Sequence, residues 1–180
     1  TPMACGLLYR AGIITASTLL VIMSLTLHCR AAGDTPLEPV SASEVLYQSV
    51  ETSRADLDRA GHRLTLDLPA EPAYVLGDPT RLTQIVSNLL QNACKYTPRG
   101  GHVPLAAISA GAQIEIVVRD NGIGIAAEDL PRLFEKFSRV RPGHERGGGG
   151  LGLGLALVRG LVSLHGGQVE VHSPGAGQGS

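Results

Sequence analysis

The segment Asn88-Leu-Leu-Gln-Asn92-Ala-Cys-Lys95-Tyr96 decides the fold of this chain. It closes a predicted helix that begins at Asp78-Pro79, because aspartate is a good N-cap and proline suits the first helical position. At about 100° per residue, Asn88, Asn92 and Lys95 share one narrow stripe. The neighbouring side, expected to pack on a sheet, carries Ile85, Val86, Leu89, Leu90 and Ala93. Amide oxygens can ligate Mg²⁺ and lysine can reach phosphate oxygens, but a polar stripe is also typical of a solvated helix face.

A second motif, Asp120-Asn-Gly122-Ile-Gly124-Ile125, directly follows a predicted strand. A carboxylate at a strand end can accept a hydrogen bond from an exocyclic amine such as that of adenine. The two glycines would let the backbone approach a flat ring closely. The same residue types also favour a plain turn. The position of the motif downstream of the asparagine stripe favours the nucleotide interpretation.

A glycine-rich run from Gly147 to Gly154 leads into Leu155-Ala-Leu-Val158, which has helical spacing. Backbone amides at a helix N-terminus favour phosphate, and glycines before the helix would let a lid move. The run is neither a P-loop nor a Rossmann fingerprint, and the remaining alternative is a simple linker. Just before it, Leu133-Phe134-Glu-Lys-Phe137 holds both phenylalanines of the chain, which are expected to anchor the lid.

Composition indicates one folded domain. The chain has 180 residues, 43% of them hydrophobic, and a net charge of −1, so nothing suggests binding to nucleic acid. The three cysteines, Cys5, Cys29 and Cys94, match no zinc or redox motif, and an odd number disfavours a disulfide framework. These features favour a reducing, cytoplasmic setting.

Residues 1–36 are interpreted as an apolar segment followed by a linker. No charged residue lies between Arg10 and Arg30, and residues 11–28 are strongly apolar. A membrane helix needs roughly 17–20 such residues, so this stretch is long enough for a marginal span. A signal-peptide core and a buried helix are alternatives. Secretion would separate the domain from ATP, which disfavours the signal peptide.

Residues 37–180 are interpreted as a second unit, built from alternating helices and strands. Helices are expected from Ser41 or Ser43 to Gly61, over 79–96 and over 151–164, and strands over 62–68, 73–76, 103–109, 113–119 and 168–172. The two strands on either side of residues 110–112 are predicted to form a β-hairpin. The pattern predicts an α+β fold, a two-layer sandwich with helices on one face of a mixed, mostly antiparallel sheet.

With four motifs in this order, residues 37–180 resemble the ATP-binding catalytic domain of sensor histidine kinases, within the superfamily of DNA gyrase, Hsp90 and MutL. Residues 88–96 match the N box, 120–124 the G1 box, 133–137 the F box and 150–158 the G2 box. The flanking residues Leu164-His165-Gly-Gly167 also agree. The resemblance implies the sandwich of the histidine-kinase/Hsp90 ATPase type, with ATP and Mg²⁺ as cofactors.

The resemblance also implies roles for single residues. Asn92 would coordinate Mg²⁺, and Asn88 and Lys95 would be the catalytic residues, with Lys95 on phosphate. Asn88 stands where the gyrase and Hsp90 relatives carry a glutamate base, and an amide cannot take a proton in that way, which favours phosphoryl transfer over hydrolysis. Asp120 would bind the adenine amine. The remaining nucleotide-binding positions would be Tyr96, Gly122, Gly124, Ile125, Phe134, Phe137, Gly150, Leu151, Gly152, Leu153 and Gly154.

The implied reaction is transfer of the γ-phosphoryl group of ATP to a histidine. Family members carry this histidine before Glu/Asp-Leu-Arg, whereas His28 is followed by Cys-Arg-Ala. The acceptor is therefore expected on a dimerisation domain outside this chain, with a response-regulator receiver domain as the next partner. We expect a cytoplasmic catalytic domain, with attachment to the inner membrane through residues 11–28 as an open alternative.

Two further departures from the family pattern lead to expectations. The family continues into another strand after Gly179-Ser180, so an exposed sheet edge is expected here. Leu151 stands where the G2 box often has threonine or serine. Three other functions stay open: a nucleotide-binding fragment without kinase activity, a gyrase/Hsp90-type ATPase, and an anti-sigma-type serine kinase.

Overall fold

The computed structural model describes residues 21–26, 37–111, 113–135, 153–175 and 177–180. Within these ranges the helices are α1 (Ala42–Ala60), α2 (Pro79–Tyr96) and α3 (Gly154–Leu164), with a short 3₁₀ turn at Leu130–Arg132. The strands are β1 (Val21–Thr26), β2 (Glu38–Ser41), β3 (Arg63–Asp67), β4 (Tyr74–Gly77), β5 (His102–Ala110), β6 (Gln113–Val118) and β7 (Gln168–Val169).

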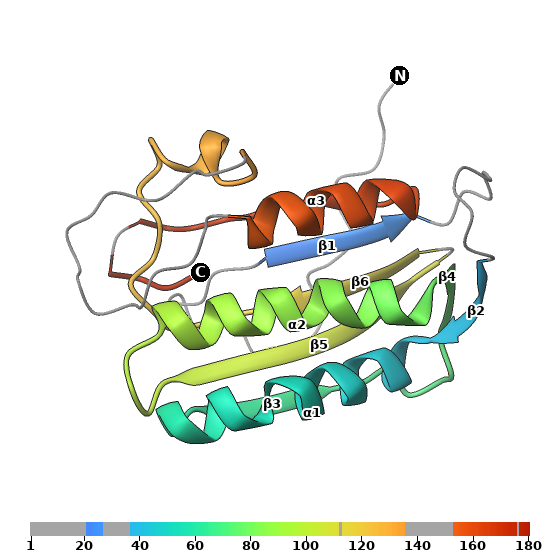
Figure 1. Ribbon diagram of the computed structural model, residues 1–180, viewed down its shortest axis with the longest axis horizontal. Helices are drawn as coiled ribbons and strands as arrows, with labels where there is room; N and C mark the ends of the chain where they lie inside the picture. The colour runs from blue at the N-terminus through green and yellow to red at the C-terminus, as the bar shows by residue number, and fades with distance from the viewer. Residues whose placement is uncertain (1–20, 27–36, 112, 136–152, 176) are drawn as a thin grey trace.

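Five of these strands form one sheet, and the three α-helices lie side by side across one of its faces (Figure 1). The strand order is β3-β5-β6-β1-β7. β3 runs parallel to β5, and the other neighbours are antiparallel. β2 and β4 form a separate antiparallel pair. β2 directly precedes α1, and β4 directly precedes the N-cap of α2. The predicted two-layer α+β sandwich with a mixed, mostly antiparallel sheet is confirmed.

Local sequence signals set the helix boundaries. The Ser41 side chain caps α1 by accepting from the Glu44 N–H, and Gly61 ends the helix in the left-handed conformation at a φ of 65°. Asp78 caps α2, its Oδ1 accepting from the N–H groups of Thr80 and Arg81 at 2.8 and 3.1 Å. These caps agree with the sequence prediction. The predicted strand 168–172 is shorter in the structure and ends at Val169.

The core lies between the helices and the sheet. α2 buries Ile85, Val86 and Leu90 completely, and these face sheet residues such as Leu105 and Ile116. Burying each large aliphatic side chain stabilises the fold by roughly 1.5–3 kcal/mol. This apolar side of α2 therefore fixes the helix on the sheet and sets the direction of its opposite, polar side.

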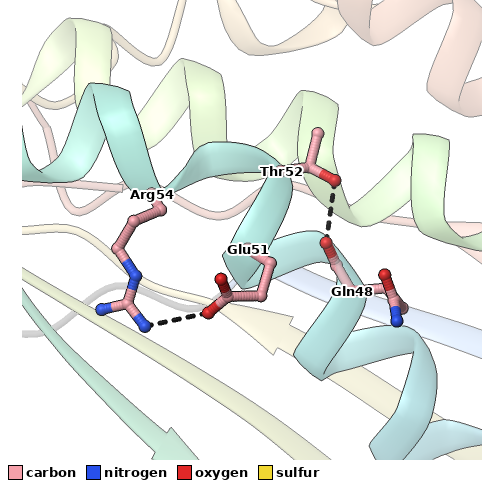
Figure 2. Close-up of polar contacts among 4 residues, drawn as sticks. All are labelled: Gln48, Glu51, Thr52 and Arg54. Atoms are coloured by element: carbon pink, nitrogen blue, oxygen red, sulfur yellow. Dashed lines mark hydrogen bonds and ion pairs between the residues drawn. The ribbon is translucent and has the colours of Figure 1, made fainter.

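The outer face of α1 carries local polar contacts between its own residues (Figure 2). Arg54 pairs with Glu51 at 2.9 Å, and the Thr52 hydroxyl donates to the Gln48 carbonyl at 2.8 Å. Both members of the ion pair are more than half exposed. Exposed pairs of this kind contribute less than about 1 kcal/mol, so α1 depends on its buried side for stability.

The N-terminal segment differs from the expected helix. Residues 21–26 of the apolar stretch 11–28 form β1, which runs between β6 and β7 and pairs with both. The expected open edge beside β6 is therefore filled. The physical reason is that an apolar run of this kind suits a strand with neighbours on both sides as well as it suits a helix. Among the residues that the structure describes, no helix meets the length and hydropathy needed to cross a membrane. Residues 11–20 and 27–28 lie outside that part.

We predict that Met23→Pro destabilises the domain. Met23 pairs with Ile116 on one side and Val169 on the other, and proline would remove its N–H from a strand with two neighbours. The loss of one ladder hydrogen bond should lower the free energy of unfolding by roughly 1–3 kcal/mol in urea denaturation. Met23→Leu, which keeps the N–H, is the control. Equal unfolding of both variants would contradict the placement of β1.

Candidate nucleotide-binding site

The polar stripe of α2 faces the start of α3. The Asn88 Nδ2 donates to the Gln84 carbonyl at 2.9 Å, which leaves the Asn88 Oδ1 directed elsewhere. The Nδ2 of Asn92 is buried and has no hydrogen-bond partner among the described residues. A buried amide without a partner costs stability unless something else satisfies it. The stripe thus contains a polar group that is suited to a ligand.

Gly154, the first residue of α3, lies against these two amides. A Cβ added at this glycine would lie 3.7 Å from the Asn88 Oδ1 and 3.9 Å from the Asn92 Nδ2. The residue before it, Leu153, makes no side-chain capping hydrogen bond to the helix. Within the described part of the chain, the N-cap residue thus supplies no side-chain cap to the first N–H groups of α3, and such groups favour an anion.

Lys95 and Tyr96 end the stripe at the C-terminal turn of α2. The Lys95 ammonium lies 5.1 Å from the centre of the Tyr96 ring, within range of a cation–π contact. Tyr96 is 45% exposed, so a face of its ring is available to a flat ligand. The carbonyl of Tyr96 accepts from the Ile123 N–H at 3.1 Å, which joins α2 to the loop that follows β6.

Asp120 begins that loop and is buried, with only 7% of its surface exposed. Its Oδ1 accepts from the N–H groups of Gly122 at 2.8 Å and Ser180 at 3.1 Å. Burial raises the pKa of the Asp120 carboxyl, and these two hydrogen bonds partly oppose the rise. Gly122 is required next to it, because a Cβ there would collide with the Tyr96 carbonyl. The carboxylate is therefore fixed in a dry position and its Oδ1 is fully engaged.

The residues after β7 also contact this loop, which the sequence analysis missed. The Asp120 N–H donates to the Ser180 carbonyl, and the Ser180 N–H donates to the Asp120 Oδ1. The Ser173 hydroxyl accepts from the Ile125 N–H at 2.8 Å. Gly124 has a φ of 65° and lies so close to the Gly175 carbonyl that a side chain would clash. The Gly and Pro residues after Ser173 are typical of a turn, but no local sequence signal indicates that this segment packs on residues 120–125.

The structure thus brings six of the predicted site residues into two joined groups. Asn88, Asn92 and Gly154 form one, and Tyr96, Asp120 and Gly122 the other. Both are carried or contacted by α2. Phe134 contacts α3, with the guanidinium of Arg159 at 6.0 Å from its ring centre. Four predicted site residues lie outside the described residues: Phe137, Gly150, Leu151 and Gly152.

Two hollows on the described surface lie elsewhere. One, of about 310 Å³, is bordered by α1 and β3 and includes Tyr47, Leu57 and Leu66. The other, of about 480 Å³, is formed by residues 67–72 and 107–109. No predicted site residue lines either of them. The chemistry of the α2 stripe and of Asp120, rather than the size of a hollow, identifies the candidate site.

Comparison with known proteins supports the assignment. Residues 77–180 match the family model described as histidine kinase-, DNA gyrase B- and HSP90-like ATPase. The chain is 40% identical over 139 residues to the sensor-like histidine kinase SenX3 of Mycobacterium tuberculosis, covering 77% of this chain and 34% of that protein. It is 42% identical over 132 residues to the histidine protein kinase DivJ of Caulobacter vibrioides, covering 73% and 22%. The chain thus spans about a third or less of the length of these relatives.

Solved structures show the same fold. The mycobacterial sensor histidine kinase MprB superposes with a TM-score of 0.61 at 34% identity, covering 72% of this chain and 80% of that one. Full-length ShkA in complex with AMPPNP gives a TM-score of 0.69 at 32% identity, covering 83% and 30%. The helices over one face of a mixed sheet are therefore shared with histidine kinases.

We predict that Asp120→Asn stabilises the folded chain at neutral pH. Because the folded pKa of Asp120 is raised, the folded state holds this proton more tightly than the unfolded chain. Stability is then lost as pH rises from the ordinary carboxyl pKa through the raised one. Asparagine keeps the acceptor for Gly122 and carries no charge. The free energy of unfolding of Asp120→Asn should therefore increasingly exceed that of the wild type as the pH rises between these two pKa values. The difference should be small below pH 3.8, the ordinary pKa of an aspartate.

Urea denaturation at a series of pH values checks this prediction. Asp67→Asn on the exposed side of β3 controls for the change in net charge. A lower free energy of unfolding for Asp120→Asn than for the wild type at neutral pH would contradict it.

Proposed function

The chain belongs to the histidine kinase-, DNA gyrase B- and HSP90-like ATPase family, and from this premise we propose that residues 37–180 form the ATP-binding catalytic domain of a two-component sensor histidine kinase. The observation that carries the proposal is the meeting of the Asn88 and Asn92 amides with the uncapped start of α3. The names of the relatives SenX3 and DivJ support the kinase assignment.

ATP would lie along the polar side of α2. We assign the adenine amine to the carboxylate of Asp120, whose Oδ2 receives no hydrogen bond from the described residues. Gly122 and Gly124 keep the backbone close to the base, and Tyr96 lies at the same end of α2. The phosphates would lie toward Lys95, Asn88 and the first N–H groups of α3, with Leu153 and the glycines before it around them.

The residues present fit Mg²⁺ at Asn92. The buried nitrogen of this amide has no hydrogen-bond partner in the described ranges, and a 180° rotation exchanges the amide nitrogen and oxygen, so Asn92 can present an oxygen ligand. Gly154 leaves the space beside it free. When bound, Mg²⁺ supplies positive charge that neutralises the phosphate oxygens during transfer.

The reaction that we propose moves the γ-phosphoryl group to a histidine on a separate dimerisation domain. The unprotonated imidazole nitrogen forms the new P–N bond, the P–O bond to the β-phosphate breaks, and ADP leaves. Asn88 cannot act as a base toward water, which disfavours hydrolysis. The proposed next partner is a response-regulator receiver domain, which takes the phosphoryl group from the histidine. We place the domain in the cytoplasm, where ATP is available.

Nucleotide binding tests the site. A fluorescent ATP analogue should bind the wild type in Mg²⁺. Asp120→Ala should weaken binding about 10- to 100-fold and lose the preference for adenine over guanine analogues, because a charged acceptor is removed. Asn92→Ala should lose the Mg²⁺ dependence. Gln91→Ala, an exposed neighbour on α2, is the matched control. Wild-type affinity in both site variants would exclude this location.

Phosphoryl transfer tests the activity. Incubation with γ-labelled ATP and a supplied histidine-containing dimerisation domain should label that domain with an acid-labile, alkali-stable phosphoramidate. Phosphate release without labelling would favour an ATPase, and an acid-stable label would favour a serine kinase. Binding of ATP without a labelled domain and without phosphate release would favour a nucleotide-binding fragment without kinase activity.

A further inference from the structure

We propose that His165 is a positioning residue that aligns α3 with α2 and thereby holds the Asn88 and Asn92 amides against Gly154. This inference rests on the proposed nucleotide site, since it concerns how that site is held in shape. His165 follows the last residue of α3 and is buried, with 8% of its surface exposed. It lies at the end of α3 opposite to Gly154.

Both ring nitrogens of His165 are engaged. The backbone N–H of Asp78 donates to Nε2 at 3.1 Å, so Nε2 must carry the lone pair. Nδ1 therefore carries the proton and donates to the Leu161 carbonyl at 2.8 Å. The surroundings thus specify one neutral tautomer. The ring connects the last turn of α3 directly to the residue that caps α2.

The His165 ring also packs closely against Gly77. A Cβ on Gly77 would lie 2.9 Å from the His165 Cδ2 and 2.7 Å from the Leu82 Cδ1, so a larger residue at position 77 would push the ring away. The Asp78 side chain is occupied by the first N–H groups of α2. His165 therefore binds to a rigid turn rather than to a mobile side chain.

Helix geometry transmits this contact to the site. α2 begins beside the C-terminal end of α3, and the middle of α2 lies beside the first residue of α3, so the two helices run antiparallel. At 1.5 Å per residue, Asn88 lies about 15 Å from Asp78, and Gly154 lies about 16 Å from His165. A sliding movement of α3 at the His165 end would therefore displace Gly154 along the amide stripe by a similar amount.

Three substitutions separate the two hydrogen bonds. His165→Gln can place an amide oxygen near the position of Nε2 and so keep an acceptor for Asp78. His165→Asn is shorter and keeps only the donor to Leu161. His165→Leu keeps neither. We expect the fluorescent ATP analogue to bind His165→Gln within about threefold of the wild type, and to bind the other two about tenfold more weakly.

Val50→Ala on α1 is the matched control, because it weakens the buried core at a residue that takes no part in the two hydrogen bonds of the His165 ring. Its affinity should stay at the wild-type value at a temperature where all variants are folded. Loss of affinity in proportion to thermal stability across all four variants would overturn the positioning role. Wild-type affinity in folded His165→Leu would also overturn it.

Amide hydrogen exchange distinguishes this inference from the proposed function. The Asp78 amide should exchange slowly in the wild type and in His165→Gln, and at least tenfold faster in His165→Leu. Failure of the wild type to bind the analogue, with this exchange pattern intact, would refute the nucleotide site alone. Equal exchange of the Asp78 amide in all variants would refute the link between α3 and α2.

Discussion

The structure depends on the two-sided character of α2. Its apolar side, with Ile85, Val86 and Leu90 fully buried, packs on the sheet, and its other side presents Asn88 and Asn92 to the start of α3. Rotation of the helix by one residue, about 100°, would bury the amides and expose the aliphatic side chains. The hydrophobic effect therefore sets the position of the polar groups, and the chemistry of the site follows from the packing of the core.

The loop after β6 holds a buried carboxylate that costs the domain stability. Ionised Asp120 in a buried position is unfavourable, and the N–H groups of Gly122 and Ser180 offset part of this cost. A residue chosen for stability alone would be neutral. In the proposed site this cost is offset when a ligand donates to the carboxylate, because hydrogen bonds to a charged acceptor in a dry environment are strong.

Local signals in the sequence predicted the helices, their caps and the α2 stripe, because each depends on residues within a few positions of one another. Asp78 and Gly61 are examples in which a single residue determines a boundary. The contact of His165 with Asp78 and that of Ser180 with Asp120 span 87 and 60 residues. Such contacts arise from tertiary packing, and neither residue carries a periodic pattern that would indicate its partner.

At the edge of β6, the tertiary structure decides between two conformations that the local sequence allows. An apolar run such as residues 21–26 fits a helix or a buried strand equally well, so composition alone cannot decide between them. In the structure, β1 pairs with residues 113–118 of β6, and Ser180 continues along the same edge at Asp120. Two segments from opposite ends of the sequence thus satisfy one row of backbone groups. The N–H of Ser180 also donates to the Asp120 carboxylate, so the residue that accepts from the Asp120 backbone at the sheet edge also helps to place the Asp120 side chain.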